Sequence, residues 1–421
     1  MKIETKCLHS GYKPGNGDPR ALPIYQSTTF TFDSTEYIGD LFDFSASAHF
    51  YSRLSNPTVA AVEDKIADLE GGIGALLTSS GQAATTISLL NILKSGDHFI
   101  SSSTIYGGTY NLFNVTLRKL GIDVTFVDPE LPIEELQKAV KPNTKAVFGE
   151  TISNPTINVL DIEKFVKLAH DNNVPFIIDN TFATPVLLRP IEYGADIVIH
   201  STTKYMDGHA IQVGGAIIDS GNFDWKKNGF TELYEPDESY HGLIYTEHFG
   251  KAAYIAKARA QMMRDYGMCQ TANGAFLLNL GLETLPLRMA KHCENAEKVA
   301  EFFETRKEIK HVGYPTLKND KNYELYKKYL PNGASGVIAI IIDGGKEKAV
   351  KFMDNLKLAS NVVHVADIRT CVLHPASETH RQLSDEQLKE AGIDAGLIRV
   401  SVGLENIDDI IADFKQALDN I

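Results

Sequence analysis

The sequence predicts an α/β fold in which a mostly parallel central sheet is followed by a smaller C-terminal α/β domain. Two observations carry this prediction. From about residue 56 to residue 250, short apolar runs alternate with helix-like stretches, which is typical of a parallel sheet covered by helices. The apolar runs also lack the alternation of a half-exposed strand, so both faces of the sheet should be buried.

Seven short runs of mainly apolar residues are the predicted strands of this sheet. They are Ala75–Thr78, Asp97–Ile100, Val124–Val127, Ala146–Phe148, Phe176–Ile178, Ile197–Ile199 and Gly215–Ile218. Helical spacing of apolar residues marks the stretches between them: Val59–Leu69, Ala83–Leu93, Tyr110–Leu120, Glu134–Val140 and Ile162–Asp171. Because such sheets bind ligands at the carboxyl ends of their strands, a site is expected in the turns that follow these runs.

The pattern divides the chain into three regions. Residues 1–55, rich in Gly, Pro, Ser and aromatic residues, are predicted to form an arm that packs on a neighbouring subunit. Residues 56–255 form the predicted large domain, and residues 256–421 the C-terminal domain with its linking helices. The helical patterns of 250–310 break near Gly267, Asn273-Gly274 and Pro286; the later predicted strands are Val337–Ile341 and Ile398–Val402, and the later helices Lys346–Asn355 and Ile407–Leu418.

Composition narrows the class of protein. The 421 residues include 41 basic and 54 acidic side chains, a net charge of -13, which argues against nucleic acid or an anionic membrane as a partner. The N-terminus has no apolar signal region, and runs such as Gly336 to Ile342 are too short to span a bilayer. The four cysteines form no CxxC pair, so we expect neither a disulfide framework nor a metal site, and a cytoplasmic location.

The most informative segment is Asp196-Ile-Val-Ile-His-Ser-Thr-Thr-Lys-Tyr-Met-Asp-Gly-His, in which Lys204 follows a buried strand and a cluster of hydroxyl groups. Burial at the edge of a sheet lowers the pKa of an amine, and a neutral amine attacks an aldehyde. Ser201 and Thr203 could hold phosphate oxygens beside it. The alternative is a surface lysine in a loop rich in Ser and Thr.

Three further elements follow other predicted strands. Asp179 ends the strand Phe176-Ile-Ile-Asp and could pair with a protonated pyridine nitrogen, although a helix cap or a metal ligand is the alternative. Thr78-Ser-Ser-Gly-Gln-Ala-Ala is a candidate phosphate-binding turn in which Gly81 allows close approach, or else an ordinary strand–helix turn. Tyr106 could stack on a flat ring or lie in the core. Together they indicate one site for pyridoxal 5'-phosphate (PLP), held as a Schiff base on Lys204.

Landmarks along nearly the whole chain resemble the Cys/Met-metabolism family of PLP-dependent enzymes, which have the aspartate-aminotransferase-like fold (fold type I). These landmarks are Pro23-Ile-Tyr-Gln, Tyr51-Ser-Arg-Leu-Ser-Asn-Pro-Thr, Leu69-Glu-Gly-Gly, Ser80-Gly-Gln-Ala, Ser153-Asn-Pro, Asp179-Asn-Thr, Ser201-Thr-Thr-Lys-Tyr, Gly208-His and Arg399-Val-Ser-Val-Gly-Leu-Glu. The lysine motif is the most specific of them. A nicotinamide-dependent dehydrogenase is disfavoured, because no GxGxxG fingerprint follows a strand.

The resemblance implies a role for each site residue. Those implied to bind the cofactor are Tyr51, Arg53, Gly81, Gln82, Tyr106, Asn154, Asp179, Thr181, Ser201, Thr203 and Lys204. The substrate would be bound by Asn154, Asn361 and Arg399, and Arg399 would hold its carboxylate. Lys204 would move protons, assisted by Tyr106 and Tyr51. Because Tyr51 and Arg53 would serve the phosphate of a neighbouring subunit, a homo-oligomer with shared sites is implied, a tetramer built from dimers.

Within the family, two stretches resemble the O-acetylhomoserine sulfhydrylase branch: Asn222-Phe-Asp-Trp through Glu235-Pro-Asp-Glu-Ser-Tyr-His-Gly, and His374-Pro-Ala-Ser-Glu-Thr-His-Arg-Gln-Leu. Gly108 stands where methionine γ-lyases usually have a cysteine, and Asn361-Val-Val-His stands where cystathionine enzymes usually read Ser-Leu-Gly-Gly. The implied reaction is γ-replacement, which turns O-acetylhomoserine and sulfide or a thiol into homocysteine or methionine and acetate.

Two departures from the family pattern leave the acyl group and the nucleophile open. Ala210 follows Gly208-His209 where the family usually has Gly, Ser or Asn, and the Asn361-Val-Val-His stretch is also unusual for the sulfhydrylases. The alternatives are a methionine γ-lyase or a cystathionine γ-synthase or lyase on the same scaffold. A non-catalytic PLP-binding protein is the alternative from another class.

Overall fold

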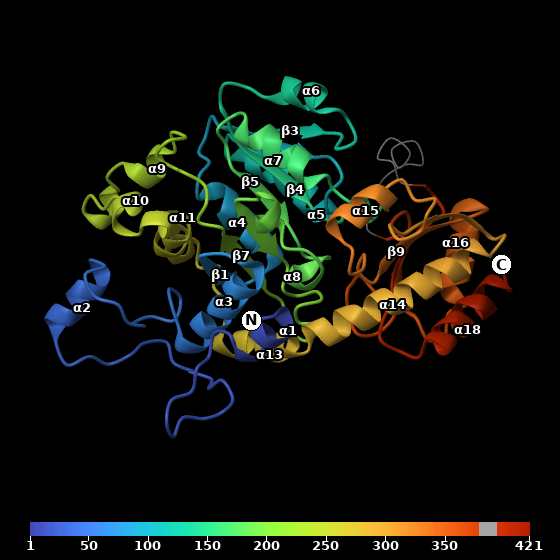
Figure 1. Cartoon of the computed structure of the whole chain (residues 1–421), viewed down its shortest axis with the longest axis horizontal. Helices are drawn as coiled ribbons and strands as arrows, with labels where there is room; N and C mark the ends of the chain where they lie inside the picture. Colours follow the sequence, from blue (N-terminus) through green and yellow to red (C-terminus); the bar gives the residue numbers. More distant parts are fainter. Residues whose placement is uncertain (379–393) are drawn as a thin grey trace.

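The elements of the computed structural model gather around two sheets (Figure 1), and the structure describes residues 1–378 and 394–421. The first sheet has seven strands in the order β1-β7-β6-β5-β4-β2-β3. They are β1 (Gly74–Thr78), β2 (His98–Ser102), β3 (Asp123–Val127), β4 (Thr144–Glu150), β5 (Phe176–Asp179), β6 (Ile197–His200) and β7 (Gly215–Asp219). β7 runs antiparallel to both of its neighbours, β1 and β6, and the other adjacent strands are parallel, so the predicted, mostly parallel sheet is confirmed.

This sheet is buried on both faces. Successive residues of its strands enter different apolar clusters: Ile178 packs with α3 (Pro57–Glu70) and α7 (Ile162–His170), whereas Ile177 packs with α4 (Gly81–Leu90) on the other side. Figure 1 shows these helices as layers around the sheet. A strand that is apolar on both faces needs such cover, and that is why the strands could be recognised as uninterrupted apolar runs.

The helices that lead to the sheet's edge have strong local start signals. Asn56 caps α3, where its side chain accepts from the Thr58 N–H and Pro57 occupies the first turn; Gly71 ends that helix with φ 80°. Ser80 caps α4 by accepting from the Ala83 N–H. Such caps satisfy backbone groups that a helix end leaves unpaired, so these two helix starts follow from the sequence.

One predicted detail of the helices was wrong. Asn273-Gly274 does not break a helix, because it lies in the first turn of α13 (Ala272–Glu283), which Thr271 caps by accepting from the Gly274 N–H. The predicted helix Tyr110–Leu120 is confirmed as a helical stretch, in which α5 (Gly107–Asn111) is continued by a π-helical segment, Leu112–Leu117. The shorter helices are α6 (Ile133–Leu136), α8 (Thr184–Leu187), α9 (Thr231–Tyr234), α10 (Tyr245–His248), α11 (Ala253–Lys257), α12 (Arg264–Tyr266) and α15 (Tyr323–Tyr329).

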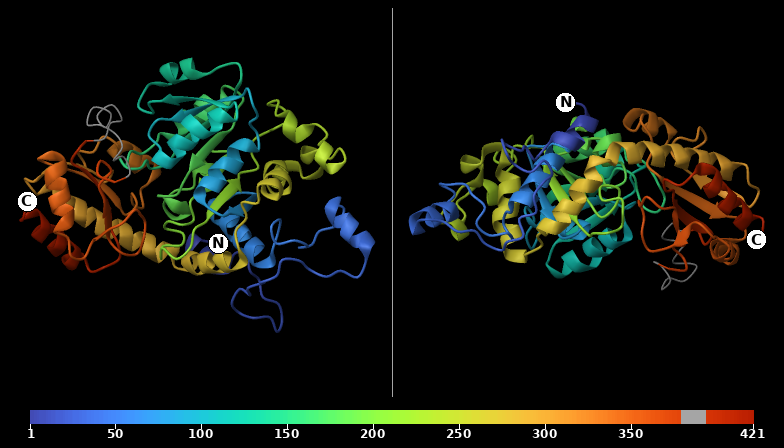
Figure 2. Two further views of the ribbon diagram at one scale, coloured as in Figure 1. Left: turned by 180° about the vertical axis from the view of Figure 1, so that it is seen from behind. Right: turned by 90° about the horizontal axis from the view of Figure 1, so that it is seen from below.

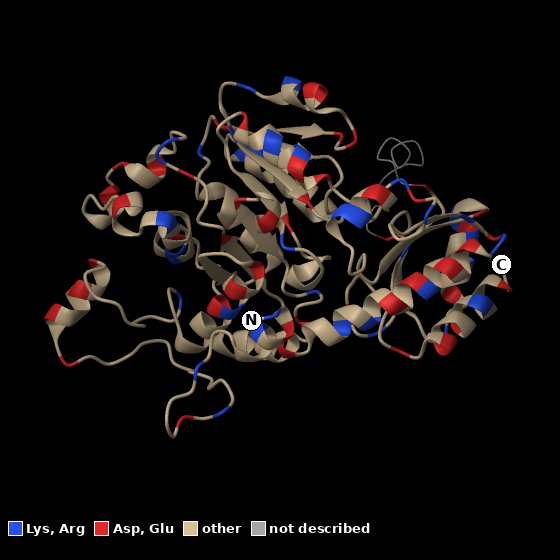
Figure 3. Cartoon of the chain, viewed as in Figure 1, with Lys and Arg blue, Asp and Glu red and all other residues tan. Residues whose placement is uncertain are grey.

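The second sheet has five strands in the order β10-β11-β12-β9-β8. They are β8 (Ile309–Gly313), β9 (Val337–Ile342), β10 (Ser360–Asn361), β11 (Cys371–Leu373) and β12 (Leu397–Ser401), with α16 (Gly345–Asp354) and α18 (Ile407–Leu418) beside them. The long α14 (Leu285–Glu304) runs from the first sheet to the second (Figure 2). Acidic and basic residues mix along α14 and α18 (Figure 3), as expected for helices with one face in solvent.

The N-terminal residues form an extended arm (Figures 1 and 2). After α1 (Ile3–His9), which packs near α3 and α13, the chain has few buried residues until Asn56, and α2 (Thr35–Phe42) stands away from the sheets. Apolar side chains on the arm, such as Tyr25 and Phe42, are 47% and 56% exposed. No helix among the residues described is long and apolar enough to span a membrane.

Candidate active site

A cavity of about 290 Å³ lies where the carboxyl ends of β1, β4, β5 and β6 meet the second sheet. Its wall on the first sheet consists of residues that follow these strands: Ser80, Gly81, Gln82, Thr85, Tyr106, Thr109, Glu150, Ile152, Asn154, Asp179, Thr181, Phe182, Ser201, Thr203, Lys204 and Val213. The opposite wall comes from the C-terminal part of the chain, through Val363, His364, Val365, Leu373 and Arg399. Most of the predicted site residues are therefore brought to one place.

Lys204 lies in the turn after β6 with its amine in this cavity. Burial, with a smaller contribution from the charge of Arg399, lowers the pKa of the amine to about 8. At pH 8 this makes the neutral, nucleophilic form roughly a hundredfold more abundant than for a free lysine. The hydrogen-bonding contact of the amine is with His364 Nδ1, at 3.5 Å.

Asp179 is held by its neighbour Thr181. The Thr181 hydroxyl and backbone N–H both donate to Asp179 Oδ1, at 2.5 and 2.9 Å, and Thr181 Oγ1 accepts from the Ser201 N–H at 2.8 Å. Burial raises the pKa of Asp179, while the donors from Thr181 favour its ionised form. These bonds fix one carboxylate oxygen and leave the other for a cation.

Glu150 is a site residue that the sequence reasoning missed. It ends β4 directly opposite Asp179 in the register, and its Oε1 accepts from the backbone N–H of Tyr106 at 2.7 Å. Burial and the nearby Asp179 carboxylate raise the pKa of Glu150 well above its usual range. The signal was available, because Glu150 is an acid at a strand's carboxyl end, as Asp179 is.

The turn after β1 closes tightly on the turn after β6. A Cβ added to Gly81 would lie 2.6 Å from Ser201 Cβ, so only glycine fits there. Gly81 and Gln82 begin α4, and N–H groups in a helix's first turn have no intrahelical acceptor. Gln82 Oε1 is buried without a partner among the described residues. The Thr203 hydroxyl already exchanges hydrogen bonds with Gly214, at 3.1 and 3.0 Å.

Arg399, on β12, faces the first sheet across the cavity. Its guanidinium donates to Asn154 Oδ1 at 3.2 Å and to the backbone carbonyl of His364 at 2.8 Å. The residue is 7% exposed, and no carboxylate of the described ranges pairs with it. A buried guanidinium without a counter-ion is suited to bind a carboxylate.

Three predicted residues lie elsewhere in the single chain. Arg53 donates to the carbonyl of Arg264 and stacks on the Tyr51 ring, with its guanidinium carbon 5.1 Å from the ring centroid; neither residue lines the cavity. Asn361 is exposed on β10, and Val363, His364 and Val365 line the cavity instead. Of the second branch motif, residues 379–383 lie outside the described residues.

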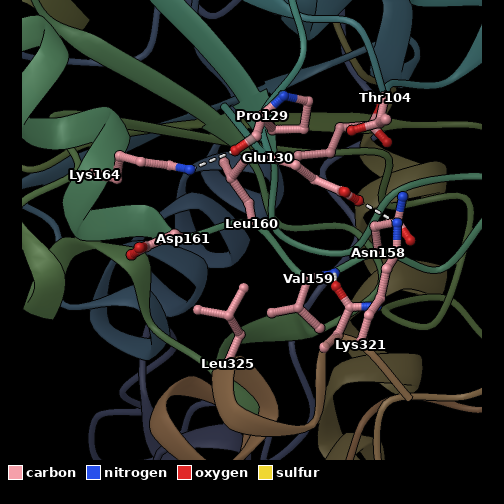
Figure 4. A pocket seen from close by; sticks show the side chains of 12 residues that line it. Thr104, Pro129, Glu130, Asn158, Val159, Leu160, Asp161, Lys164, Lys321 and Leu325 are labelled. Carbon is pink, nitrogen blue, oxygen red and sulfur yellow. Dashed lines mark hydrogen bonds and ion pairs between the residues drawn. The ribbon is translucent and has the colours of Figure 1, made fainter. Parts of the chain in front are cut away.

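Figure 4 shows a second cavity, of about 250 Å³. Its lining includes Glu150, which also lines the first cavity. Its charged groups are already engaged. Lys164 donates to the carbonyls of Pro129 and Leu131, and Lys321 pairs with Glu130. Asp161 accepts from the Tyr329 hydroxyl at 2.6 Å. The cavity at Lys204 is the better candidate for a charged ligand, because an amine, a carboxylate and a guanidinium lie there without ionic partners among the residues that the structure describes.

Comparison with known proteins identifies the family. The family model described as Cys/Met metabolism PLP-dependent enzyme matches residues 4–419. The chain belongs to this family. It is 46% identical to an O-acetyl-L-homoserine sulfhydrylase of Leptospira meyeri, over 100% of this chain and 97% of that one. It is also 46% identical to a homocysteine synthase of Schizosaccharomyces pombe, over 99% and 98% of the two chains.

A solved structure gives the same result for this PLP-dependent enzyme. A crystal structure of a candidate O-acetylhomoserine (thiol)-lyase from Campylobacter jejuni matches with a TM-score of 0.94 and 39% identity, and each chain is covered completely. That structure contains a pyridoxyl-lysine monophosphate at position 205 of its chain. The aspartate-aminotransferase-like fold and the PLP-dependent class, both predicted from the sequence, are confirmed.

The residues present fit this cofactor. The amine of Lys204 suits its aldehyde, and the turn at Gly81 and the Ser201 hydroxyl suit its phosphate. The buried Asp179 suits a pyridine nitrogen that carries a proton. The close approach of Gly81 to Ser201 and the unpaired Gln82 oxygen are features that an ordinary strand–helix turn does not need.

Proposed function

We propose that this PLP-dependent enzyme catalyses γ-replacement on an O-acylated homoserine, with O-acetylhomoserine and sulfide or a thiol as its substrates. The observation that supports this most directly is that Lys204 and Arg399 face one cavity from opposite sides, with the Arg399 guanidinium paired with no carboxylate of residues 1–378 and 394–421. An amino acid bound to Arg399 would present its Cα towards the Lys204 amine. The names of the relatives favour acetyl as the leaving acyl group.

Lys204 is the proposed attachment point of PLP and the proposed proton carrier. When bound, PLP supplies an electron sink that makes the substrate protons beside it acidic. Released from the cofactor, the Lys204 amine takes the proton from Cα and later returns one, because it lies beside that carbon throughout. A second proton then leaves Cβ, the electrons of that C–H bond form a Cβ–Cγ double bond, and acetate leaves Cγ with the electrons of the C–O bond. Sulfide adds at Cγ, protons return to Cβ and Cα, and homocysteine is formed.

The other residues hold the cofactor and substrate in this proposal. Asp179, set by Thr181, pairs with the pyridine nitrogen. Gly81, Gln82, Ser201 and Thr203 bind the phosphate, and Tyr106 covers the ring. Asn154 and Arg399 orient the substrate.

The N-terminal arm supplies the remaining part of the proposal. Tyr51 and Arg53 lie outside the cavity of their own chain, and the arm carries exposed apolar side chains. We infer that they reach the phosphate in a neighbouring subunit's site, within a tetramer built from dimers. The acidic chain with scattered cysteines suits a cytoplasmic enzyme.

A panel of acetyl-, succinyl- and phosphoryl-homoserine, each with sulfide and with cysteine, tests the function. We expect homocysteine from the acetyl ester with sulfide at a kcat/KM at least tenfold above the other combinations. Formation of 2-oxobutyrate and ammonia as main products would identify a γ-lyase instead. Cystathionine from cysteine would identify a synthase, and no turnover with any ester would leave a protein that only binds the cofactor.

A further inference from the structure

His364 is a polar side chain on the C-terminal wall of the cavity to which the proposed function gives no role. It is half-buried, lines the cavity, and places Nδ1 3.5 Å from Lys204 Nζ. The distance is at the long end for a hydrogen bond, and contacts between catalytic groups are often long before substrate binds. Its other ring nitrogen, Nε2, is buried and has no partner among the residues described.

When Lys204 carries its proton, the contact fixes the tautomer of His364. An ammonium can only donate, so Nδ1 then accepts from Lys204 and the imidazole proton lies on Nε2. Burial and the charge of Lys204 lower the pKa of His364 to about 4, which leaves the ring neutral over the range in which the amine titrates. A neutral ring can serve as an acceptor for the amine and for the ammonium alike.

The backbone holds the side chain in place independently of this contact. Residues 362–370 are pinned to the first-sheet side by the Ile368 N–H, which donates to the Gly208 carbonyl at 2.9 Å. They are also pinned to β12 by the Ala366 N–H, which donates to Ser401 Oγ at 2.8 Å. The carbonyl of His364 accepts from Arg399. A substitution of the ring therefore leaves the bond that orients Arg399.

We propose that His364 is a positioning residue for Lys204, whose released amine donates one hydrogen to His364 Nδ1 and so directs its lone pair towards the substrate's Cα. When the amine takes the Cα proton, the same bond stabilises the ammonium until the proton is returned. The proposal rests on the part of the proposed function that assigns the cofactor and the proton transfer to Lys204. It does not depend on the acyl group or the nucleophile.

Other titratable groups face this pair. Arg399 on β12 disfavours a second positive charge at Lys204, and the buried thiol of Cys371 on β11 donates to the backbone carbonyl of His364 at 3.6 Å. Asp367 and Arg369 face His364 from its own loop. Because an acceptor for the ammonium raises the pKa of an amine, removal of His364 Nδ1 should lower the pKa of Lys204 further.

Three variants of His364 separate the effect of its hydrogen bond to Lys204 from the effects of side-chain size and polarity. His364→Leu removes the acceptor. His364→Asn places an amide oxygen near the position of Nδ1 and should restore it. His364→Gln is equally polar but carries its oxygen further out, near the position of Nε2, and should not. Val362→Ala, in the same loop with a side chain outside the cavity, controls for disturbance of the backbone.

The first measurement needs no turnover. Cofactor-free protein is mixed with PLP over a pH series, and uptake is followed by absorbance. Because only the neutral amine attacks an aldehyde, the rate for the unmodified chain should rise with pH through a midpoint near 8. We expect His364→Leu and His364→Gln to lower this midpoint by about half to one pH unit. His364→Asn and Val362→Ala should keep it.

The second measurement isolates proton transfer. The loaded enzyme is incubated in D₂O with homocysteine, and exchange of the Cα hydrogen is followed by NMR. We expect about tenfold slower exchange in His364→Leu and His364→Gln, and a rate within threefold in His364→Asn. KM should change less than twofold, because the carbonyl that holds Arg399 remains.

The outcomes distinguish this inference from the proposed function. Equal midpoints and exchange rates in the Leu, Gln and Asn variants would overturn the role of His364, even if homocysteine is formed from O-acetylhomoserine. If the acetyl ester is not a substrate, the exchange and uptake experiments still report on His364. Loss of PLP uptake at every pH in Val362→Ala would show that the loop itself is required, and it would also contradict the proposal.

Discussion

The two walls of the cavity are built on different principles. On the first sheet, residues at strand ends are fixed by short local bonds, as Asp179 is by Thr181. On the C-terminal side, Arg399 lies on a strand, but His364 and the valines beside it lie on a loop. Hydrogen bonds to Gly208 and Ser401, both outside the loop, hold it in place. The position of the proposed cofactor-binding residues, on what we call the strand-end wall, is therefore set by the topology of the first sheet alone. The position of the residues proposed to bind substrate, on what we call the docked wall, depends on how the C-terminal part of the chain packs against the first sheet.

The largest expected effect tests the strand-end wall. Asp179→Asn removes the negative charge proposed to keep the pyridine nitrogen protonated, and we expect kcat to fall at least about a hundredfold. Thr181→Val removes only the hydroxyl that orients Asp179 and should cost about tenfold. Steady-state kinetics with O-acetylhomoserine and sulfide measure both.

A kcat of Asp179→Asn within threefold of the unmodified enzyme would contradict the role proposed for the first wall. Asp179 would then be a structural acid, and Glu150, its neighbour in the register, would be the next candidate partner of the ring. A larger loss in Thr181→Val than in Asp179→Asn would contradict the order of the two roles.

The next effect tests the docked wall. Arg399→Lys keeps the charge but loses the planar fork that binds a carboxylate through two hydrogen bonds. We expect KM for the amino-acid substrate to rise about tenfold and kcat to change less. Arg118→Lys, a partly exposed surface arginine that pairs with Asp123, is the control and should leave both constants unchanged. A rise in KM for sulfide alone would place Arg399 with the nucleophile instead.

The sequence was sufficient for the first wall because its signals are local. Each strand is an apolar run, the carboxyl ends of parallel strands share one edge, and caps such as Ser80 and Asn56 mark where helices start. Lys204, Asp179 and Gly81 could therefore be placed together from the sequence alone. Glu150 obeys the same rule, because it ends β4 at the same edge of the sheet as Asp179.

The second wall could not be derived in this way. The stretch from Asn361 to His364 passes from a two-residue strand into a loop. The direction of its side chains depends on tertiary contacts with β11 and β12, which no local sequence pattern reveals. Asn361 is therefore exposed while His364 lines the cavity. The Asn273-Gly274 error has a similar cause. Gly274 suits close packing rather than a turn, since a Cβ there would lie 2.6 Å from Gln270 Oε1.

The smallest expected effect tests backbone strain in the two loops that connect the two walls of the cavity. Ala210 and Ala366 both have left-handed backbone angles, with φ of 57° and 65°, and they lie in two loops joined by the Gly208–Ile368 hydrogen bond. This conformation costs a residue with a Cβ about 1–2 kcal/mol. Of the three residues expected at position 210 (Gly, Ser or Asn), Gly and Asn are the ones that adopt such an angle most readily. Glycine relieves the strain but has more freedom in the unfolded chain.

Ala210→Gly should therefore raise the free energy of unfolding by about 0.5–1 kcal/mol, as measured by denaturant titration. The same substitution at exposed Ala412, inside α18, should lower it by about 1 kcal/mol, because glycine is a poor helix former. Opposite signs for one chemical change would show that the backbone angle, and not the lost methyl group, decides the result. If both variants were destabilised equally, the backbone of the loop at Ala210 would carry no strain. The contact between the two walls would then hold no more backbone strain than the strand ends of the first sheet.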